Sequence, residues 1–125
     1  MVEFLIEESK KTPRIHLVEG AFLFRGRSII ENPKQFYEPV EEWITNYLMN
    51  PPAITEVRVE MEYCDAASKN CIFDILKILA EYQNEENNAE IIFTWCYECG
   101  DEEILAFGEY LASKLKVIFN YLEIT

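Results

Sequence analysis

The chain has 125 residues, of which half are hydrophobic and 14% are aromatic. This length and composition suit one domain with a substantial core and exclude a disordered acidic tail. Twenty-three acidic residues against eleven basic ones give a formal net charge of −12, which repels phosphate backbones and anionic lipid surfaces. No apolar run approaches the roughly 18 residues of a membrane span, and residues 1–30 carry charges throughout, unlike a signal peptide. We therefore expect residues 1–125 to form a single cytoplasmic domain that binds neither nucleic acid nor membranes.

Short apolar runs near the start of the chain predict a β-hairpin. Residues Arg14–Val18 and Ala21–Arg25 flank the pair Glu19-Gly20, and glycine suits a tight turn between two strands. Phe4–Ile6 is a candidate for a further strand before this hairpin.

A helix is predicted after the hairpin, because Asn32 offers a side-chain acceptor for an N-cap and Pro33 suits the first helical position. Apolar residues then recur every three or four positions, which marks one helical face. These residues are Phe36, Val40, Trp43, Ile44 and Tyr47. The pair Pro51-Pro52 ends the helix, since neither residue can donate a backbone hydrogen bond.

Residues 56–63 alternate as a strand does when one face is buried and the other is wet. The predicted buried set is Val57, Val59, Met61 and Tyr63, and the predicted exposed set is Glu56, Arg58, Glu60 and Glu62. A strand covered on both faces would be apolar throughout, so we expect helices on only one face of the sheet.

The second half of the chain alternates between helices and strands. We predict a helix over 68–83, a polar loop over 84–88, a strand over 91–97, a helix that opens with the acids of 100–103 and a last strand over 117–124. Strands joined through helices favour parallel pairing. The expected fold class is therefore α/β: a two-layer sandwich with a mixed β-sheet, in the order β-hairpin-α-β-α-β-α-β.

Motifs for catalysis are absent from the sequence. The single histidine, His16, lies in a predicted strand, and there is no GxSxG elbow, phosphate-cradling glycine loop or HExxH zinc motif. Acidic residues are abundant, but most fall at positions predicted to be solvated. We therefore predict no enzyme activity, no catalytic residues and no cofactor.

Four cysteines leave three interpretations open: free thiols, a metal site or a redox pair. Cys96 and Cys99 form a CxxC motif, which is the candidate for metal or redox chemistry. Its natural complement would be a second close pair, yet Cys64 and Cys71 lie seven positions apart. We predict free thiols and no metal, and we keep a CxxC-based metal or redox protein as an alternative.

Four segments resemble, in order and spacing, the SiaC family of bacterial regulatory phosphoproteins, which is related in fold to STAS-domain anti-sigma-factor antagonists. Thr12–Ile15 is similar to the family's T-P-x-I start, and Gly26–Asn32 to its G-x-S-x-P-E-N segment. Glu62–Ser68 is similar to its E-Y-x-N-T-S-S turn. Trp95–Glu98 is similar to its W-x-Y-E/D segment, which acidic residues follow both in this sequence and in the family. The resemblance covers nearly the whole chain and implies a STAS-like fold.

This resemblance implies a partner switch. In the family, a serine/threonine kinase phosphorylates a hydroxyl at the strand-to-helix turn, and a PP2C-type phosphatase removes the phosphate. The unphosphorylated form binds and activates a diguanylate cyclase, which raises cyclic di-GMP and promotes biofilm formation. A phosphate adds about −1.5 to −2 charges at one spot, which a helix N-terminus tolerates but a docked partner does not. The resemblance thus implies a non-enzymatic signalling protein with these three protein partners.

The sequence departs from the family pattern in the predicted switch turn, Asp65–Ser68. The family's threonine falls at Ala66 and the following serine at Ala67, so Ser68 is the remaining candidate for phosphorylation. A serine here is also typical of a helix cap or first turn, and so is Asp65. Two hypotheses follow: control by phosphorylation of Ser68, or a constitutive protein-binding module without phospho-control.

The resemblance also suggests partner contacts at Ser28, Glu31 and Asn32, which precede the first predicted helix. Loop and capping chemistry is the alternative explanation for these three residues. Ile30 stands where the family has proline.

Overall fold

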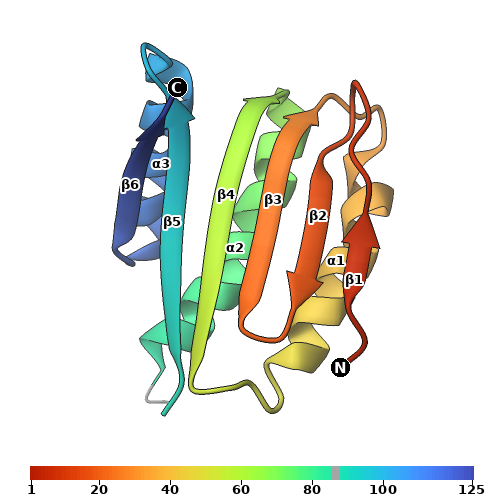
Figure 1. Cartoon of the computed structure of the whole chain (residues 1–125), viewed down its shortest axis with the longest axis vertical. Coiled ribbons are helices and arrows are strands. Elements are labelled where there is room, and N and C mark those ends of the chain that lie inside the picture. The colour runs from red at the N-terminus through yellow and green to blue at the C-terminus, as the bar shows by residue number, and fades with distance from the viewer. Residues whose placement is uncertain (86–87) are drawn as a thin grey trace.

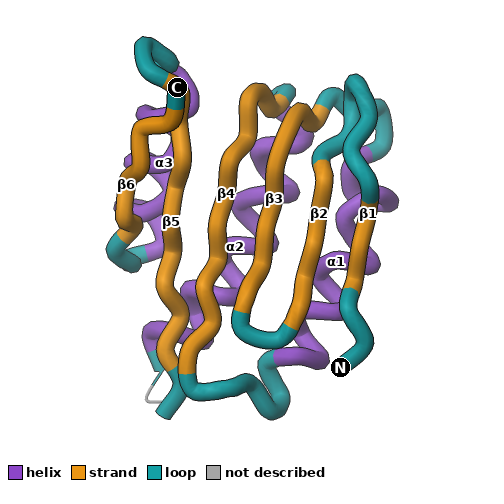
Figure 2. The backbone as a smooth tube through the Cα atoms, viewed as in Figure 1, coloured by secondary structure: helices purple, strands orange, loops and turns teal. Residues whose placement is uncertain are grey.

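The computed structural model describes residues 1–85 and 88–125 (Figure 1 and Figure 2). In chain order the elements are β1 (Phe4–Ile6), β2 (Arg14–Val18), β3 (Ala21–Ser28), α1 (Pro33–Tyr47), β4 (Ile54–Cys64), α2 (Ala66–Asn84), β5 (Glu90–Glu98), α3 (Glu102–Leu115) and β6 (Phe119–Ile124). This order confirms the predicted hairpin followed by alternating helices and strands. None of the described helices is long and apolar enough to cross a lipid bilayer.

The six strands form one mixed sheet in the spatial order β1-β2-β3-β4-β5-β6. The first three strands pair antiparallel, whereas β3, β4, β5 and β6 pair parallel. All three helices lie behind the sheet in Figure 1 and leave the other face uncovered. The predicted α/β two-layer sandwich with helices on one face is therefore confirmed. Because β3 to β6 are parallel, their carboxyl ends lie together along one edge of the sheet.

Alternation along β4 explains why the sheet has one dry face. Val57, Val59 and Met61 are at most 3% exposed and belong to the core, while the neighbouring Glu56 and Arg58 are exposed. A single cluster of buried side chains fills the space between the sheet and the helices. Burial of this continuous apolar area is the main driving force for folding.

The alternation shifts near the end of β4. The pairing register between β3 and β4 changes between Gly26 and Arg27, and beyond this point both Glu62 and Tyr63 are exposed while Cys64 is buried. The prediction that Tyr63 belongs to the core is therefore wrong, because its side chain is 47% exposed. An irregularity of this kind re-aims the side chains that follow it, which a strict period of two does not reveal.

Helix boundaries follow the local caps. α1 begins at Pro33 as predicted, but the Asn32 side chain makes no cap hydrogen bond and donates instead to Gln35 Oε1 (3.1 Å). The expectation of an Asn32 side-chain cap is therefore wrong. α2 begins two residues before the predicted start, because Asp65 rather than Ser68 is the N-cap.

The later boundaries also differ from the prediction. α2 runs to Asn84 and so enters the predicted loop 84–88, of which residues 86 and 87 lie outside the described part. β6 begins at Phe119 rather than at residue 117, since Lys116 caps α3 in a left-handed conformation (φ 59°) and reverses the chain.

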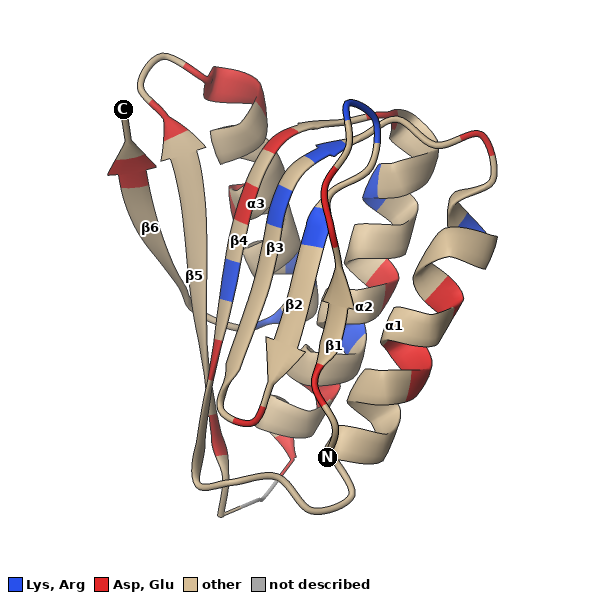
Figure 3. Cartoon of the chain, turned by 45° about the vertical axis from the view of Figure 1, so that its right-hand side comes forward, with Lys and Arg blue, Asp and Glu red and all other residues tan. Residues whose placement is uncertain are grey.

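Charge is distributed unevenly over the molecule (Figure 3). All four arginines lie on β2, β3 and β4, and each contacts a glutamate. The pairs are Arg14–Glu7 (2.7 Å), Arg25–Glu8 (3.5 Å), Arg27–Glu62 (3.1 Å) and Arg58–Glu60. Exposed pairs of this type contribute little to stability, but they cancel one another's charge. The excess negative charge of the chain therefore arises outside these four pairs.

Candidate functional site

The turn between β4 and α2 lies at the edge where the parallel strands end (Figure 1). Binding sites of open α/β sheets typically form at this edge. The turn is tied to the loop after β3 by two hydrogen bonds. The Asp65 N–H donates to the Ser28 carbonyl (3.0 Å), and the Ile30 N–H donates to Asp65 Oδ2 (3.2 Å). Two of the segments that the sequence singled out are therefore adjacent in the structure.

Asp65 holds the start of α2. Its Oδ1 accepts a hydrogen bond from the Ser68 N–H (2.8 Å), a donor that has no acceptor within the helix. Burial alone would raise the pKa of the Asp65 carboxyl, but hydrogen bonds from Ser68 and from the Ile30 N–H outweigh this effect and lower the pKa. The ionised carboxylate is therefore the form that stabilises the turn, which is the capping role the sequence allowed.

The Ser68 hydroxyl is buried in a chain of three hydroxyl groups. Ser28 Oγ donates to Ser68 Oγ (2.7 Å) and lies 2.7 Å from the Tyr37 hydroxyl. Both serines are 0% exposed. Burial raises the pKa of Tyr37 above its ordinary value, so this hydroxyl keeps its proton. This series of hydrogen-bonded hydroxyl groups joins β3, α1 and α2. It holds the candidate phosphorylation site, Ser68, away from solvent.

The exposed part of the switch turn consists of Ala66 and Ala67. These two residues occupy the first helical positions of α2, where backbone N–H groups lack acceptors within the helix. Glu31 and Asn32 are also exposed, as a contact residue must be. Ser28 is buried and supports the turn from beneath, so the structure does not present its side chain to a partner.

A groove between α2 and α3 begins at this turn. It has a volume of about 380 Å³ and is lined by Ala66, Lys69, Asn70, Phe73, Phe107 and Tyr110. Lys69 Nζ lies 5.3 Å from the centroid of the Phe107 ring, and Tyr110 is 55% exposed. Lys69 also lines a smaller hollow of about 170 Å³ beside Tyr63. Aromatic side chains at the surface are characteristic of protein interfaces.

No pattern in the sequence predicted this groove. Helical periodicity predicts which residues of α2 and α3 face the sheet, and Phe73 and Tyr110 are not among the buried residues of these helices. An aromatic residue on the solvent side of a helix was the available signal. The contact between the two helices, however, depends on the spatial order of the strands that they connect, and helical periodicity does not specify that order.

The cysteines lack the features of a reactive or metal-binding set. Cys64, Cys71 and Cys96 are buried, Cys99 is exposed, and all four are free thiols. Burial raises the pKa of Cys64 to about 12, which disfavours the nucleophilic thiolate. The described residues contain no group of three or more histidine, cysteine or acidic side chains that could hold a metal ion.

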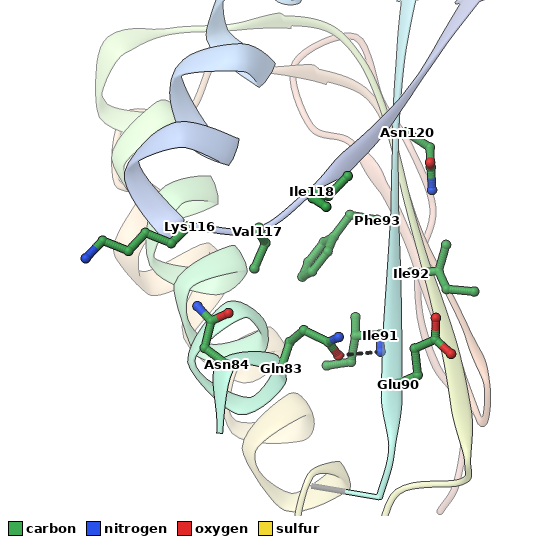
Figure 4. Close-up of a pocket in the computed structure, with 10 residues that line it drawn as sticks. All are labelled: Gln83, Asn84, Glu90, Ile91, Ile92, Phe93, Lys116, Val117, Ile118 and Asn120. Carbon is green, nitrogen blue, oxygen red and sulfur yellow. Dashed lines mark hydrogen bonds between the residues drawn. The ribbon is translucent and has the colours of Figure 1, made fainter. Parts of the chain in front are cut away.

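A larger cavity, of about 460 Å³, lies at the opposite end of the sheet, where β5 begins and the chain enters β6 (Figure 4). Two of its polar side chains already have structural partners. Gln83 Oε1 accepts from the Ile91 N–H (2.7 Å), and Asn84 Nδ2 donates to the Leu115 carbonyl (3.1 Å). These bonds fasten the end of α2 to β5 and α3, so we assign the two amides a structural role.

Comparison with known proteins identifies one family. A family model described as SiaC family regulatory phosphoprotein matches residues 6–124. No protein of curated function matches the sequence. The structure described as SiaC of Pseudomonas aeruginosa matches with a TM-score of 0.81 and 22% identity, over 100% of this chain and 98% of that chain. Apo-SiaC from the same organism matches with a TM-score of 0.78 and 22% identity, over 100% of both chains.

A third solved structure contains a complex. It is the diguanylate cyclase SiaD of P. aeruginosa with its activator SiaC, and it matches with a TM-score of 0.86 and 20% identity, over 97% of this chain and 99% of that chain. At these identities the structural likeness establishes a shared fold.

Proposed function

Since this chain belongs to the SiaC family of regulatory phosphoproteins, we propose that it is a non-enzymatic cytoplasmic regulator that binds and modulates a diguanylate cyclase. Its action would then be on cyclic di-GMP and biofilm signalling. The observation that carries the proposal is the exposed corner at Ala66 and Ala67, which opens directly onto the groove between α2 and α3. The class of partner is supported by the solved complex of similar fold, in which SiaC is the activator of a diguanylate cyclase.

The corner is suited to docking because it combines donors with apolar area. The first N–H groups of α2 and the positive end of its dipole attract an acceptor or a carboxylate of the partner. The groove beside them offers the rings of Phe73, Phe107 and Tyr110, whose burial provides the apolar part of the binding energy. A negative charge placed at this corner would repel an acidic group of the partner. It would also have to lose its hydrating water when the partner binds, and both effects oppose docking.

The experiment uses the cyclase from the same organism and measures both its binding to this chain and its rate of cyclic di-GMP synthesis. Ala66→Glu places a charge at the corner, and because an acid in the first turn suits the helix dipole, the fold is kept. We expect this variant to weaken binding at least about tenfold, the equivalent of about 1.4 kcal/mol. Thr45→Glu, an exposed position on α1, is the matched control and should bind like the parent. A parent chain that neither binds the cyclase nor alters its rate contradicts the proposal.

Two modes of control remain for this turn, and the burial of Ser68 favours the constitutive one. Phosphorylation of Ser68 would require breaking its hydrogen bond to Ser28 and moving its side chain out to solvent. The buried site cannot hold a phosphate group of charge about −2 without water around it. The exposed turn positions, Ala66 and Ala67, carry no hydroxyl. We therefore propose that the turn with Ser68 buried is the form that binds the partner, and that this form is permanent. A kinase and a phosphatase would act on this protein only if the turn opens and exposes Ser68.

Mass spectrometry after incubation with the cognate kinase distinguishes the two modes. We expect little phosphate on Ser68 in the parent chain. Ala66→Thr, which restores a hydroxyl at an exposed position, should accept phosphate if the kinase recognises this protein. Stoichiometric phosphate on Ser68 of the parent chain contradicts constitutive docking and supports phospho-control through an open turn.

A further inference from the structure

We propose that β6 is a pairing edge through which two copies of this chain join their sheets, at a surface separate from the docking corner. β6 is bonded to β5 on one side only and forms a free edge of the sheet in Figure 1. The Ile124 carbonyl accepts from the Cys99 N–H (3.1 Å), so Ile124 directs its backbone groups toward β5. Because this direction alternates along a strand, Phe119, Tyr121 and Glu123 direct theirs away from the sheet.

The two edges of the sheet differ in how they are protected. β1 has three residues and is flanked by Glu3, Glu7 and Glu8, and short edges bordered by charges resist pairing with another chain. β6 has six residues with a single charge, at Glu123. Tyr121 and Leu122 are 41% and 42% exposed. A long edge of apolar residues with so few charges is a template for strand addition.

A second copy fits this edge in an antiparallel register with twofold symmetry. Centred on Tyr121, the register pairs each Phe119 with Glu123 of the other copy and the two Tyr121 residues with each other. All three outward residues of each strand then exchange backbone hydrogen bonds, and no glutamate of β6 faces another. Such self-complementarity is what a twofold interface requires, and it selects a second copy over an unrelated strand.

The expected dimer is weak and strengthens with salt. Pairing of single edges buries less than the roughly 800 Å² per partner of a standard stable interface. Each copy also carries a net charge of −12, and the resulting repulsion is screened as ionic strength rises. An association driven by ion pairs between the copies would show the opposite salt dependence.

Sedimentation equilibrium of the full chain, at about ten to several hundred micromolar and from about 0.05 to 0.5 M NaCl, tests the proposal. We expect a monomer–dimer equilibrium that shifts toward dimer with concentration and with salt. Glu123→Pro removes an outward N–H without removing a bond to β5, which an edge strand tolerates. It should raise the dimer dissociation constant at least about tenfold.

Matched variants separate backbone pairing from charge. Glu123→Gln removes the same charge but keeps the N–H, so its dimer should be as tight as the parent's or tighter. Leu5→Lys on β1 should leave association unchanged, and circular dichroism verifies that each variant is folded. A chain that stays monomeric at every concentration and salt overturns the proposal, as does an equal shift in Glu123→Pro and Glu123→Gln.

Discussion

Asp65 is the residue on which the candidate site depends most. One carboxylate accepts hydrogen bonds from α2, through Ser68, and from the loop after β3, through Ile30. The two alanines that follow it, Ala66 and Ala67, are exposed and carry no hydroxyl. This single side chain therefore couples the start of α2 to the loop that leads into α1.

Replacing Asp65 by asparagine should change how stability depends on acid. The pKa of Asp65 in the folded chain is lowered below the unfolded value of about 3.9. Its contribution to stability is thus complete above the unfolded pKa and is lost as the pH falls through the folded pKa. Asparagine can cap the helix but does not titrate.

Urea unfolding of the parent and of Asp65→Asn between about pH 7 and pH 2 measures this effect. The difference in unfolding free energy between the two should be constant near neutral pH and should shrink below about pH 4. Asp74→Asn, at an exposed position of α2, controls for the loss of one carboxylate. A difference that stays constant down to the lowest pH contradicts this account of Asp65.

Between elements, the contact of α3 with β5 depends on a glycine. Trp95 of β5 is 1% exposed, and its Nε1 donates to the Ile104 carbonyl of α3 (2.9 Å). A Cβ added at Gly108 would lie 2.4 Å from Trp95 Nε1. Glycine inside a helix costs about 1 kcal/mol relative to alanine, and here that cost is offset because the helix can approach the indole.

Gly108→Ala should therefore destabilise the protein despite its better helix propensity. The collision with the buried indole is expected to lower the free energy of unfolding by about 1–3 kcal/mol. Denaturant titration measures this change. The exposed Ser113→Ala, on the same helix, should change it by no more than about 0.5 kcal/mol. A Gly108→Ala variant that is as stable as the parent would show that α3 can shift away from β5 at no cost.

In the molecule as a whole, one buried cluster extends across the sheet from β2 to β6. Trp43 of α1 stacks on Tyr47 and packs edge-on against Phe22 of β3, while Trp95 packs near the opposite edge against Phe119 of β6. A continuous core of this size predicts a single cooperative unfolding transition.

The two tryptophans allow that cooperativity to be measured. In Trp43→Phe the tryptophan fluorescence comes from Trp95 alone, and in Trp95→Phe it comes from Trp43 alone. Within each variant, the fluorescence and far-ultraviolet circular dichroism transitions in urea should share one midpoint. Different midpoints within one variant would reveal that the α1 side and the α3 side unfold independently.

Local sequence patterns were sufficient to predict the order of the elements and the one-sided sheet. Alternation at Val57, Val59 and Met61 and the periodic apolar faces of the helices are local patterns, and local patterns specify which side of an element is buried. The family resemblance also follows from short segments read in order, as the match over residues 6–124 confirms.

Which side chains of the candidate site reach solvent depends on contacts between segments that are distant in the sequence. Ser68 is buried and accepts a hydrogen bond from Ser28, a residue forty positions away. Tyr63 is exposed because the register between β3 and β4 shifts. The groove arises where α2 and α3 lie side by side. Each of these features depends on a contact between distant segments, and no local period along one segment carries that information.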